Sequence, residues 1–600
     1  MLKKRTLNIV SLLALLFTVT YSMNGCSPDF AADESLYSLK PYRSSTVAEL
    51  KSSCDSQIED IEPTALRRLS TQEYNATIHA IFQCEYNCYY SASPYLDPAL
   101  DTLPSDAKRD SISTYVRFSN LDQQMSDERV AAYHSVALAA ANYIETLPPA
   151  QDGGFGRVFD SCFVSGVTPD VTCQDKMIRG FGLKAFRRPL SDSQFNAIKT
   201  AMAAGTGFKQ QLGFAVYFIL MSPDFIYHLE SDGTQIGTVL TLDSYGVASK
   251  ISYLLMGRNP DAELLTRASQ NKLQTKAEID AALEYIKATY PALLKDQFWK
   301  FTSEWLDVST TAFTNNTKSN AQSAPEFSVS SQGAAVRSDM NQEIRSMFEY
   351  YIFDHPQTYF DLLTNQKSFA RGSVLPALYG VAAWDGVSAP PNHVAGQRKG
   401  FLTTAAILTP GATITHPFTT GGLVHKHILC REFGDTPEPK NFPGLDQTQE
   451  GALTSTRTKY EQLVPRASAC MSCHSSIESL GMTFQSYDTF GRFRNGIEKV
   501  HASDGSFVGT TPVNTRTTPL VGTGLVDVVD AVDLIGRIAN TTEPQACLAK
   551  QFLRYSYSRK DGPRDSCALY RFASNLQTAT TWDAVKSFID DDWFKKRRLD

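Results

Sequence analysis

Beyond an apolar stretch near its start, the 600-residue sequence lacks any run of 18 or more apolar residues. A helix that spans a membrane needs about 20 such residues, so we expect the body of the protein to be soluble. The sequence also lacks a long basic run, and its 57 basic and 63 acidic residues leave a formal net charge of −6. We therefore expect no nucleic acid partner, and we read the short basic cluster at 595–598 as a solvated helix end or tail.

Strand patterns are scarce, which predicts a mainly α, multi-domain protein with little β structure. The clearest helix start is Ser70, which forms a capping box with Glu73 before an apolar face of Tyr74, Ile78, Ile81 and Phe82. Similar patterns predict helices at 127–146, after Ser191, after Asp243, and at 277–307, 338–365, 525–540 and 543–557. The Ser- and Asn-rich stretch 309–335 is expected to be a loop, and 505–524 a short β-hairpin or an irregular loop.

The N-terminus has the pattern of an export signal. Lys3, Lys4 and Arg5 precede an apolar stretch from about Leu7 to Val19, which is too short for a permanent spanning helix. The sequence Met-Asn-Gly-Cys-Ser at 23–27 resembles the bacterial lipoprotein signal, in which the cysteine is acylated. We therefore predict lipidation of Cys26 and a site on the periplasmic side of the envelope, as an outer-membrane lipoprotein. The alternative is ordinary signal-peptide cleavage that leaves Cys26 as a thiol.

The cysteines divide into three groups. Cys470-Met-Ser-Cys473-His474 has the spacing that attaches haem c covalently, and Cys26 belongs to the signal. The other eight allow four disulfides in an oxidising compartment. We expect Cys162 to pair with Cys173 and Cys547 with Cys567, because short loops join them. Cys84 and Cys88 have a helical spacing that disfavours a mutual bridge, so one of them is a candidate partner for Cys54.

In a haem site, Cys470 and Cys473 are the thioether anchors and His474 is the proximal iron ligand. The alternatives are a disulfide, or a zinc site completed by His416, His425 or His427. The distal ligand stays open among these histidines, His501 and Met482, although core packing is the favoured role of Met482. Arg492 and Arg494 are candidate partners of the haem propionates, because guanidinium groups bind carboxylates well; surface salt bridges are the alternative.

Several motifs together resemble the planctomycete-type cytochrome c family, which consists of large exported bacterial proteins made of several domains of unknown function. Leu66-Arg-Arg-Leu-Ser and Phe186-Arg-Arg-Pro-Leu resemble its first two domains, and Met221-Ser-Pro-Asp-Phe and Leu378-Tyr-Gly-Val its central domain. Arg398-Lys-Gly-Phe-Leu-Thr opens the haem-bearing domain. The chain departs from the family at Glu478-Ser-Leu-Gly, and at Met482 where phenylalanine is usual. The resemblance implies one haem c but supplies no substrate.

These patterns predict seven segments: signal peptide 1–25, tether 26–63, N-terminal helical domain 64–150, second helical domain 155–232, central helical domain 233–388, haem c-bearing domain 392–503 and C-terminal helical domain 504–600. The leading hypothesis for function is electron transfer in the cell envelope, with a redox protein as partner and membrane attachment through the lipid anchor alone. The alternatives are a peroxidase-like or oxygenase-like haem enzyme with an open distal site, and an envelope scaffold in which haem is auxiliary.

Overall fold

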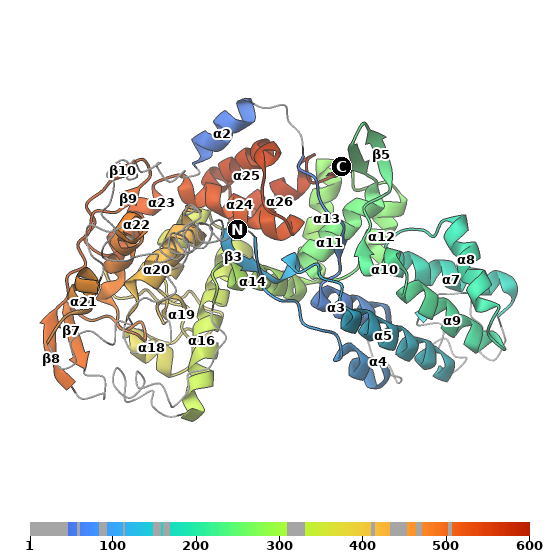
Figure 1. Cartoon of the computed structure of the whole chain (residues 1–600), viewed down its shortest axis with the longest axis horizontal. Coiled ribbons are helices and arrows are strands. Elements are labelled where there is room, and N and C mark those ends of the chain that lie inside the picture. Colours follow the sequence, from blue (N-terminus) through green and yellow to red (C-terminus); the bar gives the residue numbers. More distant parts are fainter. Residues whose placement is uncertain are drawn as a thin grey trace, which may run out of the picture. The chain divides into compact units, whose positions relative to one another are not determined.

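We analysed a computed structural model of the chain (Figure 1). It describes residues 46–56, 61–82, 93–111, 114–147, 158–159, 162, 169–308, 330–409, 415–431, 453–463, 471–501 and 507–599. The expected signal peptide, Cys26, Cys84, Cys88 and Cys470 lie outside these ranges. Within them, no helix combines the length and the apolar character needed to cross a bilayer.

The chain forms two compact units, and it is mainly helical, as predicted. One unit lies within residues 308–547 and also takes in Val47; we call it the motif unit, because it contains Cys473 and His474. The other unit is built from two stretches, 48–307 and 548–600, and we call it the split unit.

The first half of the split unit is a group of helices around one apolar core. Its helices are α3 (Thr71–Phe82), α4 (Ser93–Leu100), α5 (Asp127–Thr146), α7 (Val171–Phe186), α8 (Asp192–Met202), α9 (Phe208–Leu220) and α10 (Pro223–Ile226). The capping box of α3 is confirmed, because Glu73 N donates to Ser70 Oγ at 3.2 Å and Ser70 N donates to Glu73 Oε2 at 2.8 Å. The predicted apolar face of α3 is buried in the core that α5 and α9 share.

The second half of the split unit joins segments that are far apart in sequence. Its helices are α11 (Ser244–Met256), α12 (Ala262–Ser269), α13 (Lys276–Thr289), α14 (Pro291–Trp305), α25 (Ser566–Thr578), α26 (Thr581–Asp590) and the part of α24 (Glu543–Tyr557) after Cys547. The helix predicted at 277–307 is therefore two helices, because Pro291 lacks the backbone N–H that a continuous helix needs. Phe298 and Phe301 of α14 pack on Phe552 of α24 with ring centroids 6.2 and 5.3 Å apart.

The basic cluster at the C-terminus is not the solvated tail that the sequence suggested. Residues Lys596–Arg598 form strand β11, which pairs antiparallel with β6 (Val239–Leu242), and β6 pairs with β5 (Gly233–Ile236). Lys595 is 7% exposed. Backbone pairing to a strand more than 350 residues earlier explains the error, because the charge pattern carries no sign of that partner.

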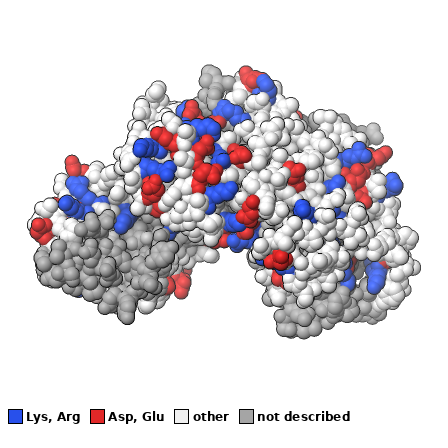
Figure 2. All heavy atoms as spheres, turned by 180° about the vertical axis from the view of Figure 1, so that it is seen from behind, with Lys and Arg blue, Asp and Glu red and all other residues white. Residues whose placement is uncertain are grey.

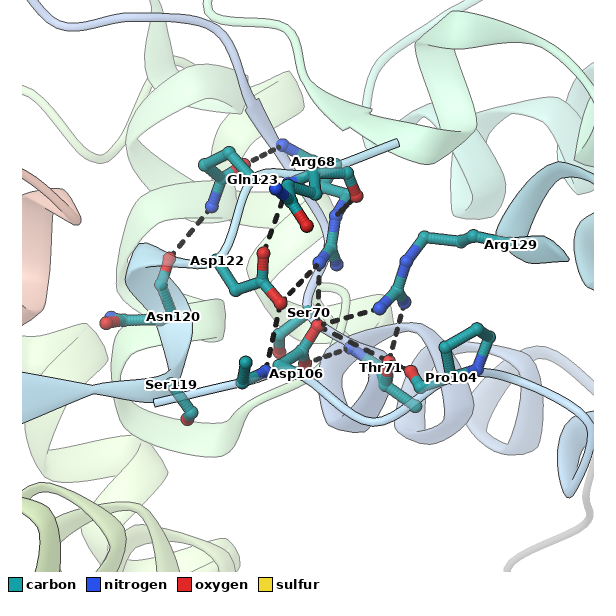
Figure 3. Close-up of polar contacts among 12 residues, drawn as sticks. Arg68, Ser70, Thr71, Pro104, Asp106, Ser119, Asn120, Asp122, Gln123 and Arg129 are labelled. Carbon is teal, nitrogen blue, oxygen red and sulfur yellow. Dashed lines mark hydrogen bonds and ion pairs between the residues drawn. The ribbon is translucent and has the colours of Figure 1, made fainter. Parts of the chain in front are cut away.

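The two arginines of strand β1 (Arg67–Arg68) have different surroundings, as alternate side chains of a strand do. β1 pairs with β4 (Tyr227–His228). Arg68 is fully buried and lies 2.8 Å from Asp106, which also accepts a hydrogen bond from the backbone N–H of Thr71 (Figure 3). Arg129 from α5 donates to Thr71 Oγ1 at 2.7 Å. This buried network joins β1, the start of α3 and α5, whereas Arg67 lies 3.1 Å from Glu73.

The helices of the motif unit are α16 (Ser330–Glu349), α17 (Tyr359–Thr364), α18 (Val374–Tyr379), α19 (Ala405–Leu408), α20 (Pro417–Leu423), α21 (Thr456–Leu463), α22 (Met471–Gly481) and α23 (Ala531–Ala539). Short π or 3₁₀ turns lie at η4 (Tyr350–Asp354), η5 (Phe401–Thr403), η6 (Val424–Ile428) and η8 (Met482–Ser486). The loop expected at 309–335 is wrong at its C-terminal end, because α16 already begins at Ser330; the rest of that stretch lies outside the described residues.

The strands of the motif unit form two hairpin-like pairs. β7 (Ile497–His501) pairs with β8 (Phe507–Pro512), and β9 (Leu520–Val521) pairs with β10 (Gly524–Leu525). The β-hairpin expected in 505–524 is thus present in part, and its first partner strand begins earlier, at Ile497.

Three disulfides lie within the described residues. The predicted bridge between Cys162 and Cys173 is confirmed. The predicted Cys547–Cys567 bridge is wrong, because Cys547 bonds Cys430 and Cys567 bonds Cys54. The suggestion that Cys54 pairs with Cys84 or Cys88 is wrong for the same reason. Cys54 lies in α2 (Val47–Asp55), a helix within the segment expected to be a tether.

Charged side chains on the surface are mixed in sign. Figure 2 shows basic and acidic side chains interspersed over the described residues of the face that it presents. This agrees with the near-balanced charge of the sequence.

Candidate functional site

The haem-attachment motif lies at the start of helix α22. The helix begins at Met471, so Cys473 and His474 are in its first turn, directly after Cys470. The structure does not describe the side chains of 471–475, and Cys470 lies outside the described residues. The structure thus places Cys473 and His474 in one helical turn. That turn holds two of the three residues that the sequence assigned to haem.

Helix α22 is held against α20 by contact between the two backbones. A Cβ atom on Gly421 would lie 2.0 Å from the carbonyl oxygen of Ile477, and a Cβ atom on Gly481 would lie 1.7 Å from that of Pro417. Both distances are far below van der Waals contact, so only glycine permits this approach at either position. The sequence reading did not assign these glycines a role, because their close approach involves a helix some 60 residues away.

Two of the candidate distal ligands lie on η6, an element that contacts α22. His425 and His427 are on η6, and both are buried. Burial, together with the charges of Arg431 and Lys426, lowers the pKa of His425 to about 3. Its imidazole is therefore neutral at pH 7, which is the state that coordinates a metal.

The remaining candidates have other surroundings. His416 precedes α20, and its Nδ1 lies 3.3 Å from the hydroxyl oxygen of Tyr460. Met482 is 4% exposed at the start of η8, as expected for a residue that packs in the core. His501 ends β7, and its side chain lies outside the described residues.

Both arginines proposed as propionate partners have a carboxylate neighbour in the protein. Arg492 Nε lies 2.6 Å from Asp488 Oδ2, and both side chains are partly exposed. Arg494 Nη2 lies 3.7 Å from Glu498 Oε1, and Arg494 also donates to the carbonyl oxygen of Gln485 at 3.1 Å. The contact of Arg492 fits the surface salt-bridge alternative, whereas the pair of Arg494 and Glu498 is largely buried; the propionate role of both arginines stays a prediction.

A buried arginine, Arg398, joins the motifs on which the family resemblance rests. Its guanidinium donates to the carbonyl oxygens of Thr403 and Gly491, and it lies 3.9 Å from the ring centroid of Tyr379 and 5.1 Å from that of Tyr487. Tyr379 belongs to the motif that begins at Leu378, and Thr403 to the one that begins at Arg398, so two of the motifs meet at one side chain. The motifs themselves do not indicate that these residues lie in contact.

A carboxyl group lies beside this arginine. Tyr379 donates its hydroxyl to Glu343 Oε2 at 2.6 Å, and it accepts a hydrogen bond from the backbone N–H of Ala405. Burial raises the pKa of Glu343 to about 7, although the Tyr379 hydrogen bond and the charge of Arg398 oppose the rise. This cluster joins α16, α18 and α19, and we assign it a structural role in supporting the domain that carries α22.

The end of η6 is fixed by a second buried pair. Arg431 and Glu543 are 1% and 0% exposed in their side chains, and their closest nitrogen and oxygen atoms are 2.9 Å apart. Arg431 also donates to the carbonyl oxygen of Leu520, and Glu543 accepts from the backbone N–H of Gly522. Together with the neighbouring Cys430–Cys547 disulfide, this pair joins η6 to α24.

Within the described part of the chain, no three His, Cys, Asp or Glu side chains gather in a way that would hold a metal ion. The side chains of the motif lie outside that part, so the zinc alternative stays open. The donor set of the motif, the thiols of Cys470 and Cys473 and the imidazole of His474, fits covalent haem in its chemistry.

Two family models match parts of the chain. PSD4, described as a protein of unknown function (DUF1592), matches residues 242–381, and PSCyt3, also described as a protein of unknown function (DUF1588), matches residues 398–496. Both are domains of unknown function associated with planctomycete cytochromes c, which is what the sequence motifs indicated. No curated protein and no solved structure matches the chain.

Proposed function

We propose that the protein is an exported, lipid-anchored c-type cytochrome that binds one haem covalently and transfers electrons in the cell envelope. The observation that carries this proposal is the position of Cys473 and His474 in the first turn of α22, directly after Cys470. A bound haem supplies an iron that alternates between two oxidation states and so carries one electron.

The chain's own residues would hold and orient the group. Cys470 and Cys473 would anchor it through thioethers, and His474 would bind the iron. The glycine contacts between α20 and α22 fix the direction of the helix that presents these residues. His425 and His427 are buried on η6, which contacts α22, and we propose them as candidates for the second axial position.

Export is supported by the disulfides. The described residues contain three, and two of them link cysteines more than 100 residues apart. Such bridges persist in oxidising compartments, which is also where apocytochromes of this type receive their haem. For the anchor, metabolic labelling with a radioactive fatty acid should mark the wild-type protein and leave Cys26→Ser unlabelled. Equal labelling of both would contradict the assignment of Cys26.

Haem attachment is tested by expressing the full chain in a bacterium that carries the haem-attachment machinery. After denaturing electrophoresis, the wild-type band should stain for haem, and the band of the Cys470→Ser/Cys473→Ser variant should not. The Cys162→Ser/Cys173→Ser variant is a matched control, because it also loses two cysteines but leaves the motif intact. A wild-type band without covalent haem would overturn the proposal.

Spectroscopy then separates electron transfer from the alternatives. A six-coordinate, low-spin haem that does not bind carbon monoxide is expected for an electron-transfer protein. A high-spin haem that binds carbon monoxide would instead indicate a peroxidase-like or oxygenase-like enzyme. A cellular role that survives loss of the two motif cysteines would indicate a scaffold in which haem is auxiliary.

A further inference from the structure

The split unit contains a polar pocket that is separate from the haem motif. It is lined by residues of β1, α3, α11, α14, α24 and β11, together with His228 and Glu230. Its volume of about 50 Å³ exceeds the 10–15 Å³ that one water molecule needs, so it has room for a small ionic group. Tyr253, Tyr555 and Tyr557 form much of its wall.

Positive charge predominates in the pocket lining. Four cationic side chains line it, whereas only two carboxylates do. The cations are Arg67, Lys250, Lys300 and Arg597, and the carboxylates are Glu73 and Glu230. Of the four cations, Arg67 alone forms an ion pair with a carboxylate within the described residues, at 3.1 Å from Glu73. Glu230 offsets part of the charge of the other three cations, and the excess that remains is available to an anion.

The contacts of Lys250 are with neutral groups and do not include an ion pair with a carboxylate of the described residues. Its Nζ donates to the carbonyl oxygen of Phe594 at 2.7 Å and lies 3.3 Å from the hydroxyl of Tyr557. It also lies 4.5 Å from the ring centroid of Tyr557 and 4.7 Å from that of Phe594. Burial lowers the pKa of Lys250, and the positive charges of Arg559, Arg597 and Arg67 add to this effect, while Glu230 opposes it. An anion bound among these groups would relieve their mutual repulsion.

Arg597 is a second, independent observation that points to a bound anion, because one of its N–H donors is unsatisfied. Its Nη1 donates to the backbone carbonyl oxygen of Glu230 at 3.2 Å. Its Nε is buried and has no hydrogen-bond partner among the described residues. A buried, unsatisfied donor on a charged group is costly, because it loses its hydration without replacement. Nε–H groups of arginine suit carboxylate and phosphate oxygens.

We propose that this pocket binds a small molecule through an oxyanion group, a carboxylate or a phosphate, which Lys250 and Arg597 hold. Lys300 adds positive charge from α14. The Arg67–Glu73 pair and His228 form another part of the wall, where Glu73 keeps Arg67 partly neutralised. This inference is independent of the haem proposal, because every lining residue belongs to the split unit.

The test is calorimetric titration of the full-length protein with inorganic phosphate and, separately, with succinate, at constant ionic strength set with sodium chloride. Saturable binding of at least one of them is expected. Lys250→Gln and Arg597→Gln should each weaken binding by about tenfold or more, because a charge-assisted hydrogen bond is lost. Lys272→Gln is the matched control, since Lys272 is an exposed lysine of the same unit outside the pocket, and it should bind as the wild type does.

The two titrations identify the oxyanion. Binding of phosphate alone assigns a phosphate group, and binding of succinate alone assigns a carboxylate. Absence of saturable binding for both, or equal affinity in the pocket variants and the wild type, overturns the proposal. If circular dichroism shows that Lys250→Gln or Arg597→Gln is unfolded, Lys300→Gln replaces it under the same criteria. Because titration needs no haem signal, its result stands whether or not haem is attached.

Discussion

A Cβ atom on Gly421 in α20 would lie only 2.0 Å from the carbonyl oxygen of Ile477 in α22. The two helices therefore touch through their backbones, about one turn after His474 in α22. The adjacent Gly422 differs sharply, because a Cβ atom there would meet no atom within 4 Å. Alanine at Gly422 therefore tests helix propensity alone, and alanine at Gly421 tests helix propensity together with the close contact.

We expect Gly421→Ala to destabilise the motif unit and Gly422→Ala to leave it as stable or to stabilise it. Alanine favours a helix over glycine by about 1 kcal/mol at either position. At Gly421 the added methyl group must push α22 away, and such overpacking costs about 1–3 kcal/mol or more. Differential scanning calorimetry of both variants measures the difference. Equal melting temperatures would contradict the close contact.

Local sequence patterns predicted the starts of several helices, although the helices expected at 277–307 and 338–365 are each broken in the structure. The capping residues Ser70, Ser191 and Asp243 each precede a helix as expected, because capping is a contact over three or four residues. The helix predicted at 127–146 has the same bounds in the structure. Pro291 was the local signal that the sequence reading overlooked, and it divides α13 from α14.

Contacts between distant segments were not predictable in the same way. Arg398 and Gly491 are 93 residues apart, and nothing in either motif indicates that one binds the other. The pocket combines Arg67 with Arg597, which the sequence assigned to a solvated tail. Of the candidate site, the sequence therefore provided the motif itself, while the glycine contacts and the buried pairs required the fold.

The disulfide between Cys54 and Cys567 should contribute more stability than the one between Cys162 and Cys173. The first closes a sequence separation of 513 residues and the second one of 11. In the chain-entropy model, a longer closed loop restricts the unfolded chain more, and the difference here is about 3 kcal/mol. Replacing each pair by serine and comparing the calorimetric transitions tests this. If removal of the Cys162–Cys173 bridge lowers stability more than removal of the Cys54–Cys567 bridge, the result would count against the entropic account.

The pair of Arg431 and Glu543 should be sensitive to loss of one partner and tolerant to loss of both. Removing one member of a buried ion pair leaves an uncompensated charge, which costs about 3–5 kcal/mol, whereas apolar replacement of both is often neutral. We therefore expect Glu543→Ala to be strongly destabilising and Arg431→Met/Glu543→Leu to recover most of the loss. Urea denaturation of the single and double variants measures both values. A double variant as unstable as the single one would show that the pair itself is required.

Acid should destabilise the split unit through His228. Burial lowers the pKa of His228 from 6.5 to about 4, with the charges of Arg67 and Arg187 adding to the effect and Glu73 opposing it. Between these two pH values the unfolded chain binds a proton at this residue and the folded chain does not. The unfolding free energy therefore falls as the pH drops from about 6.5 to about 4, by up to about 3 kcal/mol.

Urea denaturation at a series of pH values measures this fall in the unfolding free energy, and at lower pH it also reports on Glu73. Burial opposes ionisation of Glu73, but Arg67 and the nearby His228 hold its pKa well below the usual 4.5. Its ionised form stabilises the fold above that pH, and this contribution is lost on further acidification. We expect His228→Gln to flatten the stability profile between pH 6.5 and about 4 while keeping the loss below it. His134→Gln, which replaces an exposed histidine of α5, is the control. Its unfolding free energy should depend on pH as that of the wild type does, because His228 stays buried. A His228→Gln profile identical to that of the wild type would mean that His228 is not the group whose protonation opposes folding in this range.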